Sequence, residues 1–206
     1  GETDRHLSFF EMLGNFSVGE YFKEDAIKYS YEYITEVLKV DKDKLWFTVY
    51  KDDDEAYQIW REVIGVPADR IQRGNEDNFW HMNIPGPCGP CSEIFIDRGK
   101  KYGKDGGPIG GGEDRFIEIW NLVFMESIQD QPFQVIDELP KKNIDTGMGL
   151  ERMAMIMQDK ENLFDTDLFK PLHDALLSQV TQNDDKYEKI IIDHIKSSTF
   201  MISDGV

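Results

Sequence analysis

The chain has 206 residues, of which 40% are hydrophobic and 12% aromatic, enough for one large domain or for one domain and part of another. Its formal net charge of −17 argues against tight binding of nucleic acid by this chain alone, because phosphates repel an acidic surface. No apolar run approaches the roughly 20 residues that span a membrane, and residues 1–8 are too polar for a signal peptide. We therefore expect a cytoplasmic protein without a membrane partner.

The first third of the chain carries strand and helix patterns in alternation. Residues 6–15 are expected to form a strand ending in a Gly-Asn turn, and residues 45–50 a second strand rich in aromatic and β-branched side chains. Residues 24–40 repeat apolar side chains at helical spacing. Residues 52–64 begin with three aspartates, which favour a helix N-terminus, and Gly65 marks the helix end. The residues expected to face inward on this second helix are Ala56, Ile59, Trp60 and Val63.

The rest of the chain contains further strands before three C-terminal helices. Residues 75–90 look like a loop, and residues 99–112 like a mobile, Gly- and Lys-rich loop. Strands are expected at 93–97, 116–124 and 133–139, and helices at 150–157, 167–180 and 186–203. Strands joined by short loops with interspersed helices predict an α+β fold, an antiparallel sheet flanked by helices. No G-x-G-x-x-G or P-loop follows the first strand, which argues against a doubly wound nucleotide fold.

Two cysteines, Cys88 and Cys91, lie in the sequence PGPCGPCSE. A single C-x-x-C pair is compatible with half of a zinc site or with redox activity. However, His81, His173 and His194 do not have the spacing of zinc ligands, and a thioredoxin-like βαβ pattern is lacking. The neighbouring prolines and glycines favour a third interpretation, a rigid turn with a structural or substrate-loop role.

The strand FIEIWNLVF contains an asparagine among apolar neighbours. A buried amide is costly unless it is hydrogen-bonded, so Asn121 either pairs with backbone or reads a small polar ligand, whose size Val123 would then limit. Strict alternation sends successive side chains to opposite faces. One face is expected to carry Ile117, Ile119, Asn121 and Val123, and the other Glu118, Trp120 and Leu122.

The segment KNIDTGMGLERMAMIMQ is the most informative of the chain, because an acidic residue, a turn and two glycines lead into a helix with an early arginine. Asp145 can hold an ammonium group, and Gly147 and Gly149 let the backbone approach a ligand closely. Arg152, near a helix N-terminus, can bind phosphate. An alternative is a Gly-containing loop before a purely structural helix. That helix would bury Leu150, Met153, Ala154 and Met157.

Six stretches of the chain occur in the order in which one known family has them. The stretches are RHLSFFEMLGNFSVGEYFK (5–23), LWFTVYKDDDEAYQIW (45–60), DNFWHM (77–82), GPCGPCSEIF (86–95), EIWNLVFM (118–125) and IDTGMGLERM (144–153). Together they resemble the catalytic domain of the alanyl-tRNA synthetases, and DTGMGLER resembles the third signature motif of class II synthetases. The resemblance implies the class II fold. It also implies activation of alanine with ATP and Mg²⁺ to alanyl-adenylate, followed by transfer of alanine to tRNA(Ala).

The resemblance also implies roles for individual residues. Asp145 would hold the alanine ammonium group, Asn121 would bind alanine, and Val123 would wall the small pocket. Arg152 would bind a terminal phosphate and act as the catalytic cation, by charge neutralisation and positioning rather than covalent chemistry. The ATP site would comprise Met12, Trp80, Ile119, Trp120, Asn121, Gly147, Gly149 and Arg152, with Trp80 also lining the alanine pocket.

The resemblance divides the chain into residues 1–158, the adenylation core, and residues 159–206, the start of a helical tRNA-recognition domain. It also has departures. Leu7 stands where many members have a histidine. The first motif, the strand with the α-phosphate arginine and the family's zinc-binding segment are not in this chain. We therefore expect a catalytic fragment with weak or no activity alone. The alternatives are a noncatalytic relative that binds a ligand or partner, and a C-x-x-C metal or redox protein.

Overall fold

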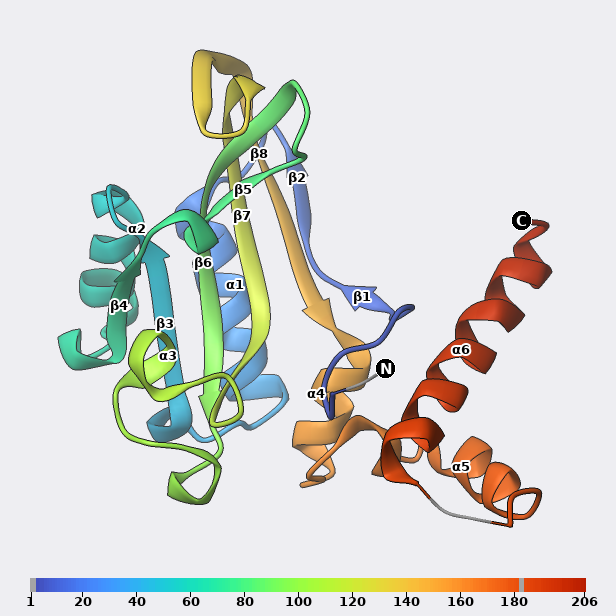
Figure 1. Cartoon of the computed structure of the whole chain (residues 1–206). Coiled ribbons are helices and arrows are strands. Elements are labelled where there is room, and N and C mark those ends of the chain that lie inside the picture. The colour runs from blue at the N-terminus through green and yellow to red at the C-terminus, as the bar shows by residue number, and fades with distance from the viewer. Residues whose placement is uncertain (1–2, 182–183) are drawn as a thin grey trace. The chain divides into compact units, whose positions relative to one another are not determined.

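The computed structural model describes residues 3–181 and 184–206 (Figure 1). It divides into two compact units: Leu13–Met148 form one, and Gly1–Met12 with Gly149–Val206 form the other. The short strand β1 (Met12–Leu13) lies at the boundary in sequence. No helix among the described residues has the length and apolar character needed to cross a membrane.

The unit of residues 13–148 is built on a sheet with the strand order β8-β7-β6-β3-β4, in which β2 pairs with β8 and β5 with β6. Among its described strands, β3 and β4 are parallel and the other pairs are antiparallel. This confirms the predicted α+β class. The strands are β2 (Phe16–Val18), β3 (Leu45–Tyr50), β4 (Ile71–Gly74), β5 (Phe79–His81), β6 (Gly86–Asp97), β7 (Phe116–Gln131) and β8 (Gln134–Gly149).

Two helices of this unit confirm the helical patterns of the sequence. Helix α1 (Lys23–Glu32) continues as a π-helical turn to Val37, and α2 (Asp54–Gln58) continues similarly to Ile64. Asp53 caps α2, because its side chain accepts from the Ala56 N–H at 3.0 Å. Gly65 ends the helix with a φ of 85°, a conformation that favours glycine. Val63 is 47% exposed, so the expectation that it faces inward is wrong.

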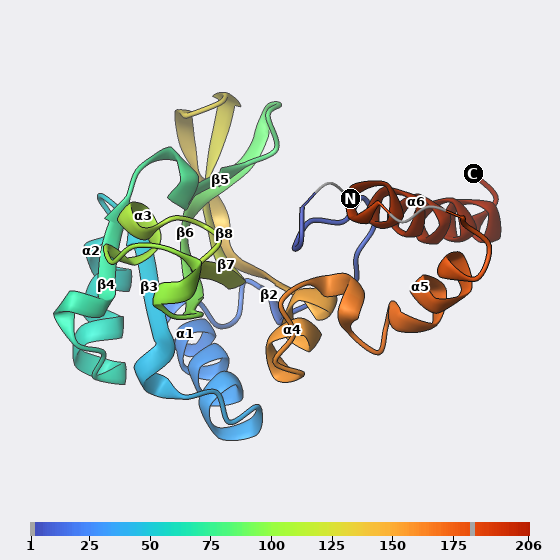
Figure 2. The ribbon, with the colours of Figure 1, turned by 60° about the horizontal axis from the view of Figure 1, so that its bottom comes forward.

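The core lies between α1, the helix of residues 54–64 and one face of the sheet (Figures 1 and 2). Phe47 of β3 packs on Trp60 with ring centroids 4.2 Å apart, and Tyr33 meets Trp120 of β7 edge to face at 5.9 Å. The Trp60 indole N–H also donates to the Ser92 hydroxyl at 2.9 Å. These contacts define the helix-covered face of the sheet; the other is called here the open face.

Several strands are longer than their sequence patterns suggest. Strand β6 includes the whole GPCGPC segment, so the expected loop at 75–90 and the expected rigid turn around the cysteines are both wrong. Strand β8 runs from Gln134 to Gly149, so Asp145 and Gly147 lie in a strand rather than in a turn. In contrast, the strand expected at 6–15 shrinks to the two residues of β1.

The loop expected at 99–112 contains the short helix α3 (Gly107–Gly111). Buried Arg115 holds this loop, since it donates to Asp97 at 2.7 and 2.8 Å and to Asp105 at 2.8 Å. An ideal Cβ on Gly107 would lie 2.6 Å from the Trp46 ring. Helix α3 therefore lies against the lower part of the open face, where Trp46 pairs with Phe95.

The second unit contains the helices α4 (Leu150–Met157), α5 (Lys170–Leu177) and α6 (Asp185–Asp204). Its N-terminal segment is held by two buried carboxylates. Asp193 accepts from the N–H and hydroxyl of Ser8 at 2.8 and 2.6 Å, and Glu151 accepts from the Glu11 N–H and from Lys196. Met153 is buried, but Met157 is 49% exposed, which corrects part of the expected apolar face of α4.

Candidate active site

The strand register places the polar residues predicted from the sequence side by side. Val123 pairs directly with Asp145, and Asn121 pairs with Gly147 across β7 and β8. On the other edge of β7, Asn121 pairs with Glu93. Because paired residues share a face and side chains alternate along a strand, these side chains belong to one face. It is the face opposite to that of Trp120 and its helical cover, that is, the open face.

A β-bulge at Ile119 changes which residues reach this open face. Ile94 pairs with Trp120, but the next residue, Phe95, pairs with Glu118, so β7 has one extra residue at Ile119. As a result, Glu118 shares a face with Asn121. Strict alternation along FIEIWNLVF, which placed Glu118 on the opposite face, is therefore wrong. Ile117, which pairs with Ile96, correspondingly lies on the helix-covered face rather than beside Asn121.

Glu93 is a largely buried carboxyl within this row. It accepts from the Thr48 hydroxyl at 2.9 Å and from the Asn78 side-chain amide at 3.2 Å. Burial, together with the nearby negative charge of Glu118, raises the pKa of Glu93 to about 8. Neither glutamate was predicted as a site residue, because their proximity follows from the bulge.

Asp145 is half-buried beside Val123, and burial raises the pKa of its carboxyl. No cationic side chain among the described residues offsets that loss of hydration. On its other edge Asp145 pairs with exposed Phe16 of β2. A desolvated carboxylate without a protein cation is a good receptor for an ammonium group supplied by a ligand.

Asn121 keeps an open acceptor. Its side-chain oxygen Oδ1 is buried and has no hydrogen-bond partner among the described residues. Such an atom costs free energy until a donor reaches it, which favours ligand recognition over a purely structural role. Its neighbours in β7 are both buried, with the Trp120 ring under Tyr33 on the helix-covered face, so any nucleotide contact of Trp120 would come from its backbone.

Trp80 lies in β5, where it pairs with Gly89 and is half-buried. Gly89 allows β7 to come unusually close, since an ideal Cβ there would lie 1.9 Å from the carbonyl oxygen of Phe124. The GPCGPC segment thus brings β5 and β7 to opposite edges of β6. The role of Trp80 in lining a pocket stays a prediction.

Three predicted ATP-binding residues belong to the other compact unit. Met12 is in β1, and Gly149 forms the N-cap of α4 without a side-chain contribution. Arg152, in the first turn of α4, is half-buried, and its guanidinium donates to the carbonyl oxygen of Arg5 at 3.5 Å. Their contacts with a nucleotide stay predictions.

The cysteines do not support the metal or redox alternatives. Both thiols are free and buried, and burial raises the pKa of each, so neither is a reactive thiolate. The part of the chain that the structure describes holds no group of three or more potential metal-ligating His, Cys, Asp or Glu side chains. A zinc site at the C-x-x-C pair is thus unsupported.

A charged hollow of about 430 Å³ lies where β3 ends and α2 begins. Lys23, which is 4% exposed, fills its wall and pairs with Asp53 at 3.0 Å, Glu55 at 3.2 Å and Glu126 at 3.6 Å. Burial lowers the pKa of Lys23, but these carboxylates outweigh that effect and the net pKa is raised. The cluster joins α1, α2 and β7 and is best explained as structural.

The family of this chain follows from its similarity to known proteins. The family model described as tRNA synthetases class II (A) matches residues 1–206. The chain belongs to this family. The mostly antiparallel sheet with flanking helices agrees with the class II synthetase fold, whose members use an amino acid, ATP with Mg²⁺, and tRNA.

Curated class II relatives share about half of the sequence. The chain is 50% identical over 223 aligned residues to an alanine–tRNA ligase of Corynebacterium glutamicum (strain R). It is 49% identical to one of Thermobifida fusca (strain YX) and 48% identical to one of Mycobacterium sp. (strain KMS). Each alignment covers 100% of this chain and 25% of the relative. The chain therefore spans about a quarter of the length of these relatives.

Proposed function

We propose that this chain is the alanine-activating catalytic part of an alanine–tRNA ligase. In the reaction, the alanine carboxylate attacks the α-phosphate of ATP, giving alanyl-adenylate and pyrophosphate, and alanine then passes to the 3′ end of tRNA(Ala). Membership of the class II family and the names of the relatives support the reaction class. The arrangement on the open face supports the amino acid.

The pairing of Val123 with Asp145, next to Asn121, is the observation that carries the proposal. Asp145 supplies a desolvated carboxylate for the alanine ammonium group, and Asn121 supplies a buried acceptor. Val123, between them on the same face, limits the space for the side chain. A pocket of this kind excludes large amino acids, but one methyl group allows only about 10–200-fold discrimination against glycine. Activation of glycine and serine as errors is expected.

The proposed nucleotide site uses backbone more than side chains. Ile119, Trp120 and Asn121 would run along the nucleotide, with Trp80 and Gly147 lining the site. Arg152 would bind a terminal phosphate as the catalytic cation, Gly149 would approach ATP, and Met12 would lie near adenine. These last three roles rest on the motif sequences. Rate enhancement would come from in-line positioning and charge neutralisation.

Mg²⁺ has suitable ligands on the open face. Mg²⁺ prefers carboxylate oxygens, usually one or two, together with substrate phosphates and water. Glu93 and Glu118 share the open face, and the charge of Glu118 lies close enough to raise the pKa of Glu93, so the two carboxyls would fit a divalent cation. When bound, the ion supplies positive charge beside the phosphates. The protein's own contribution is to hold Glu93 through Thr48 and Asn78.

The tRNA partner would be bound mainly by other segments of a longer protein. With a net charge of −17, this chain offers little electrostatic attraction for tRNA. Residues 159–206 are proposed as the beginning of a helical tRNA-recognition domain after an adenylation core of residues 1–158. An enzyme with these substrates would work in the cytoplasm.

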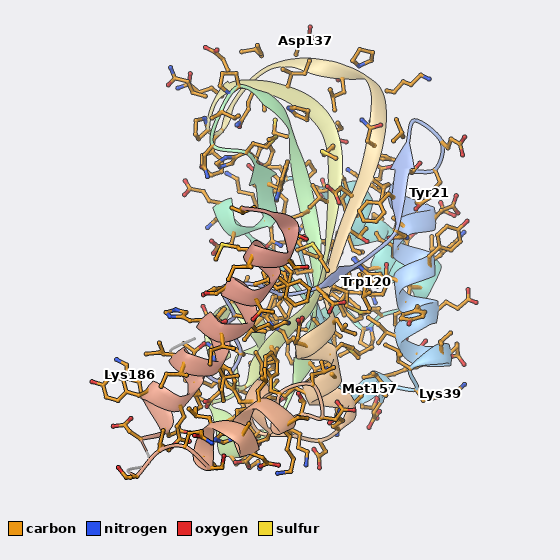
Figure 3. All side chains as sticks on the ribbon, turned by 90° about the vertical axis from the view of Figure 1, so that its right-hand side faces the viewer. Tyr21, Lys39, Trp120, Asp137, Met157 and Lys186 are labelled. Atoms are coloured by element: carbon orange, nitrogen blue, oxygen red, sulfur yellow. The ribbon has the colours of Figure 1, made fainter. Side chains whose placement is uncertain are left out.

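The test compares Asp145→Asn with Asp137→Asn. Both residues lie in β8, but Asp137 is exposed at the tip of the β7–β8 hairpin, far along the sheet from Trp120 (Figure 3). Binding of a non-hydrolysable alanyl-adenylate analogue is measured by calorimetry, and alanine-dependent ATP–pyrophosphate exchange is measured in parallel. Removing one partner of a buried charge pair costs about 2–5 kcal/mol, so Asp145→Asn should weaken analogue binding by roughly 30-fold or more.

Asp137→Asn should bind the analogue like the unmodified chain. Equal binding by Asp145→Asn and the unmodified chain would contradict the assignment of the ammonium site. A chain that binds the analogue but shows no exchange would be a binding fragment that needs additional sequence for chemistry. A chain that binds neither alanine nor the analogue would refute the proposed function for these residues.

A further inference from the structure

The side-chain amide of Asn121 has two ends with opposite hydrogen-bonding character, so its usefulness depends on its orientation. With Oδ1 toward the ligand it accepts from an ammonium group, whereas with Nδ2 toward the ligand it would repel one. Oδ1 is buried without a partner. Something must therefore hold the other end of the amide, because free rotation would let the amide find the better-paired orientation.

The thiol of Cys91 is placed to hold that end. Cys91 pairs with Val123 across β6 and β7, and Asn121 is its diagonal neighbour on the same face. Diagonal neighbours on one face of a sheet are close enough for side-chain contact, and the side-chain amides of Asn121 and Asn78 both act to lower the pKa of the Cys91 thiol. The single thiol hydrogen is directed elsewhere, since Cys91 Sγ donates to the carbonyl oxygen of Asp77 at 3.7 Å. The sulfur therefore meets the Asn121 amide as an acceptor.

We propose that Cys91 is a positioning residue, whose sulfur accepts from Nδ2 of Asn121 and so keeps Oδ1 of Asn121 turned toward the alanine ammonium group. The proposal rests on the function proposed above. It assigns a role to one cysteine of the C-x-x-C pair that involves neither metal binding nor oxidation. Cys88 is not part of the contact, because it pairs with Ser127 and His81 beyond the irregular stretch of β6.

The surroundings of Cys91 are suited to a fixed acceptor. Cys91 is 1% exposed, and burial with the nearby Glu93 and Glu118 carboxyls keeps its pKa well above the usual value, so the thiol retains its hydrogen. The neighbouring Asn78 is also fixed in place, since its side-chain amide donates to the Thr48 hydroxyl at 2.8 Å and to Glu93 at 3.2 Å. A protonated thiol in a rigid polar frame gives Asn121 one preferred orientation.

The first arm of the test observes the amide directly, without any ligand. The side-chain NH₂ resonances of Asn121 are assigned by NMR from their loss in Asn121→Asp. Cys91→Ala should shift these resonances and speed their exchange with water, whereas Cys88→Ala should leave them in place. Cys91→Ser keeps an acceptor oxygen and should retain part of the protection. Unchanged Asn121 resonances in folded Cys91→Ala would overturn the proposal.

The second arm measures affinity for the alanyl-adenylate analogue and for ATP. Cys91→Ala should weaken analogue binding by about tenfold, the effect of one hydrogen bond, and leave ATP binding unchanged. In an Asn121→Ala background the same substitution should cause no further loss, because Cys91 acts through Asn121. Additive losses, or equal losses for analogue and ATP, would show a merely structural role and overturn the proposal.

The two arms separate this proposal from the proposed function. If neither alanine nor the analogue binds to the unmodified chain, the proposed function is refuted, and the NMR arm alone still decides whether Cys91 orients Asn121. If Cys91→Ala proves unfolded by circular dichroism, Cys91→Val, which removes the acceptor but fills more of the space, is the deciding variant. Unchanged Asn121 resonances and unchanged analogue affinity in folded Cys91→Val, which has no acceptor atom in its side chain, would also overturn it.

Discussion

Glu93 and Asp145 are carboxyl groups on the same face of the sheet, and burial raises the pKa of both. Among the described residues, no cation offsets the loss of hydration of Asp145. Glu93 additionally lies near the like charge of Glu118. Keeping such groups costs folding free energy, and cations from ligands can recover it. The two carboxyls of the open face therefore cost stability, as expected of groups that a ligand cation would stabilise.

Substitution of Glu93 by glutamine should change how stability depends on pH. The pKa of Glu93 is about 8 in the folded chain, against 4.5 for an ordinary glutamate. The folded state therefore binds the proton more tightly than the unfolded state. The resulting stabilisation is fully present below pH 4.5 and is lost as the pH rises through 8. The free energy of unfolding is measured with urea in the presence of EDTA. Between pH 5 and pH 9, the difference between Glu93→Gln and the unmodified chain should shift by about 1–3 kcal/mol in favour of the variant.

Glu138→Gln is the matched control, because Glu138 is exposed on β8. It should leave the pH profile of unfolding unchanged. A Glu93→Gln variant whose stability runs parallel to that of the unmodified chain from pH 5 to 9 would contradict the assigned environment. Added Mg²⁺ should reduce the difference, since a bound cation favours the ionised carboxyl.

The predicted site residues are those that have a strong local signature in the sequence. Asp145, Asn121 and Val123 stand out as an acidic residue in a glycine-containing motif and an amide in an apolar strand, and their register now brings them together. Glu118 and Cys91 could not be placed in this way. Their position depends on a bulge at Ile119 and on cross-strand pairing, neither of which leaves a local pattern in the sequence.

At the scale of elements, the irregular pairing of β6 with β7 depends on a glycine. An ideal Cβ at Gly89 would lie 1.9 Å from the carbonyl oxygen of Phe124, and this backbone atom has no freedom to move aside within the sheet. Gly89→Ala should separate the strands locally and destabilise the chain by about 2–4 kcal/mol. Urea unfolding followed by tryptophan fluorescence measures the change.

Gly110→Ala provides the comparison, since a Cβ there meets nothing within 4 Å. Gly110 lies in α3, where alanine is the better helix former, so this variant should be unchanged or stabilised by up to about 1 kcal/mol. Similar destabilisation by both substitutions would mean that the cost at Gly89 is not caused by the contact with Phe124.

Elements with their own local pattern were predicted well, and elements defined by partners were not. Strand β3 matches its prediction residue for residue, and the helix up to Ile64 begins at its aspartates and ends at Gly65. Strand β6 was cut short because proline and glycine normally weaken a strand pattern. Its extension follows from pairing with β5 and β7, which supply the missing hydrogen bonds from outside the segment.

Across the whole molecule, the excess of negative charge destabilises the folded state, because like charges repel one another. The chain has 40 acidic residues and 23 lysines and arginines. Raising NaCl from about 0.02 M to 0.5 M shortens the screening length to a few ångströms, which weakens long-range repulsion more than it weakens buried pairs such as Lys23–Asp53. We expect the Tm, measured by calorimetry, to rise by several degrees. A Tm that falls with salt would show that attractive surface pairs outweigh the net repulsion.

The α+β class of the whole chain was predictable because it requires only the kinds of elements and their order. The pairing order β8-β7-β6-β3-β4 and the parallel pair β3–β4 were not, because they depend on long-range contacts. The same holds for the division into two units, in which residues 1–12 join residues 149–206. Nothing near Ser8 in sequence indicates its partner Asp193.

That pairing sets an order of events on the ribosome. Ser8 and Asp193 are 185 residues apart, so the segment around Ser8 emerges long before its partner has been made. At about 5–20 residues per second, the wait is roughly 10–40 s, ample time for residues 13–148 to fold. During synthesis, the apolar side chains near Ser8, such as Phe9, which stacks on Phe200, remain without their final cover. These side chains are therefore exposed until residues 184–206 have been made, a state that favours chaperone binding or aggregation.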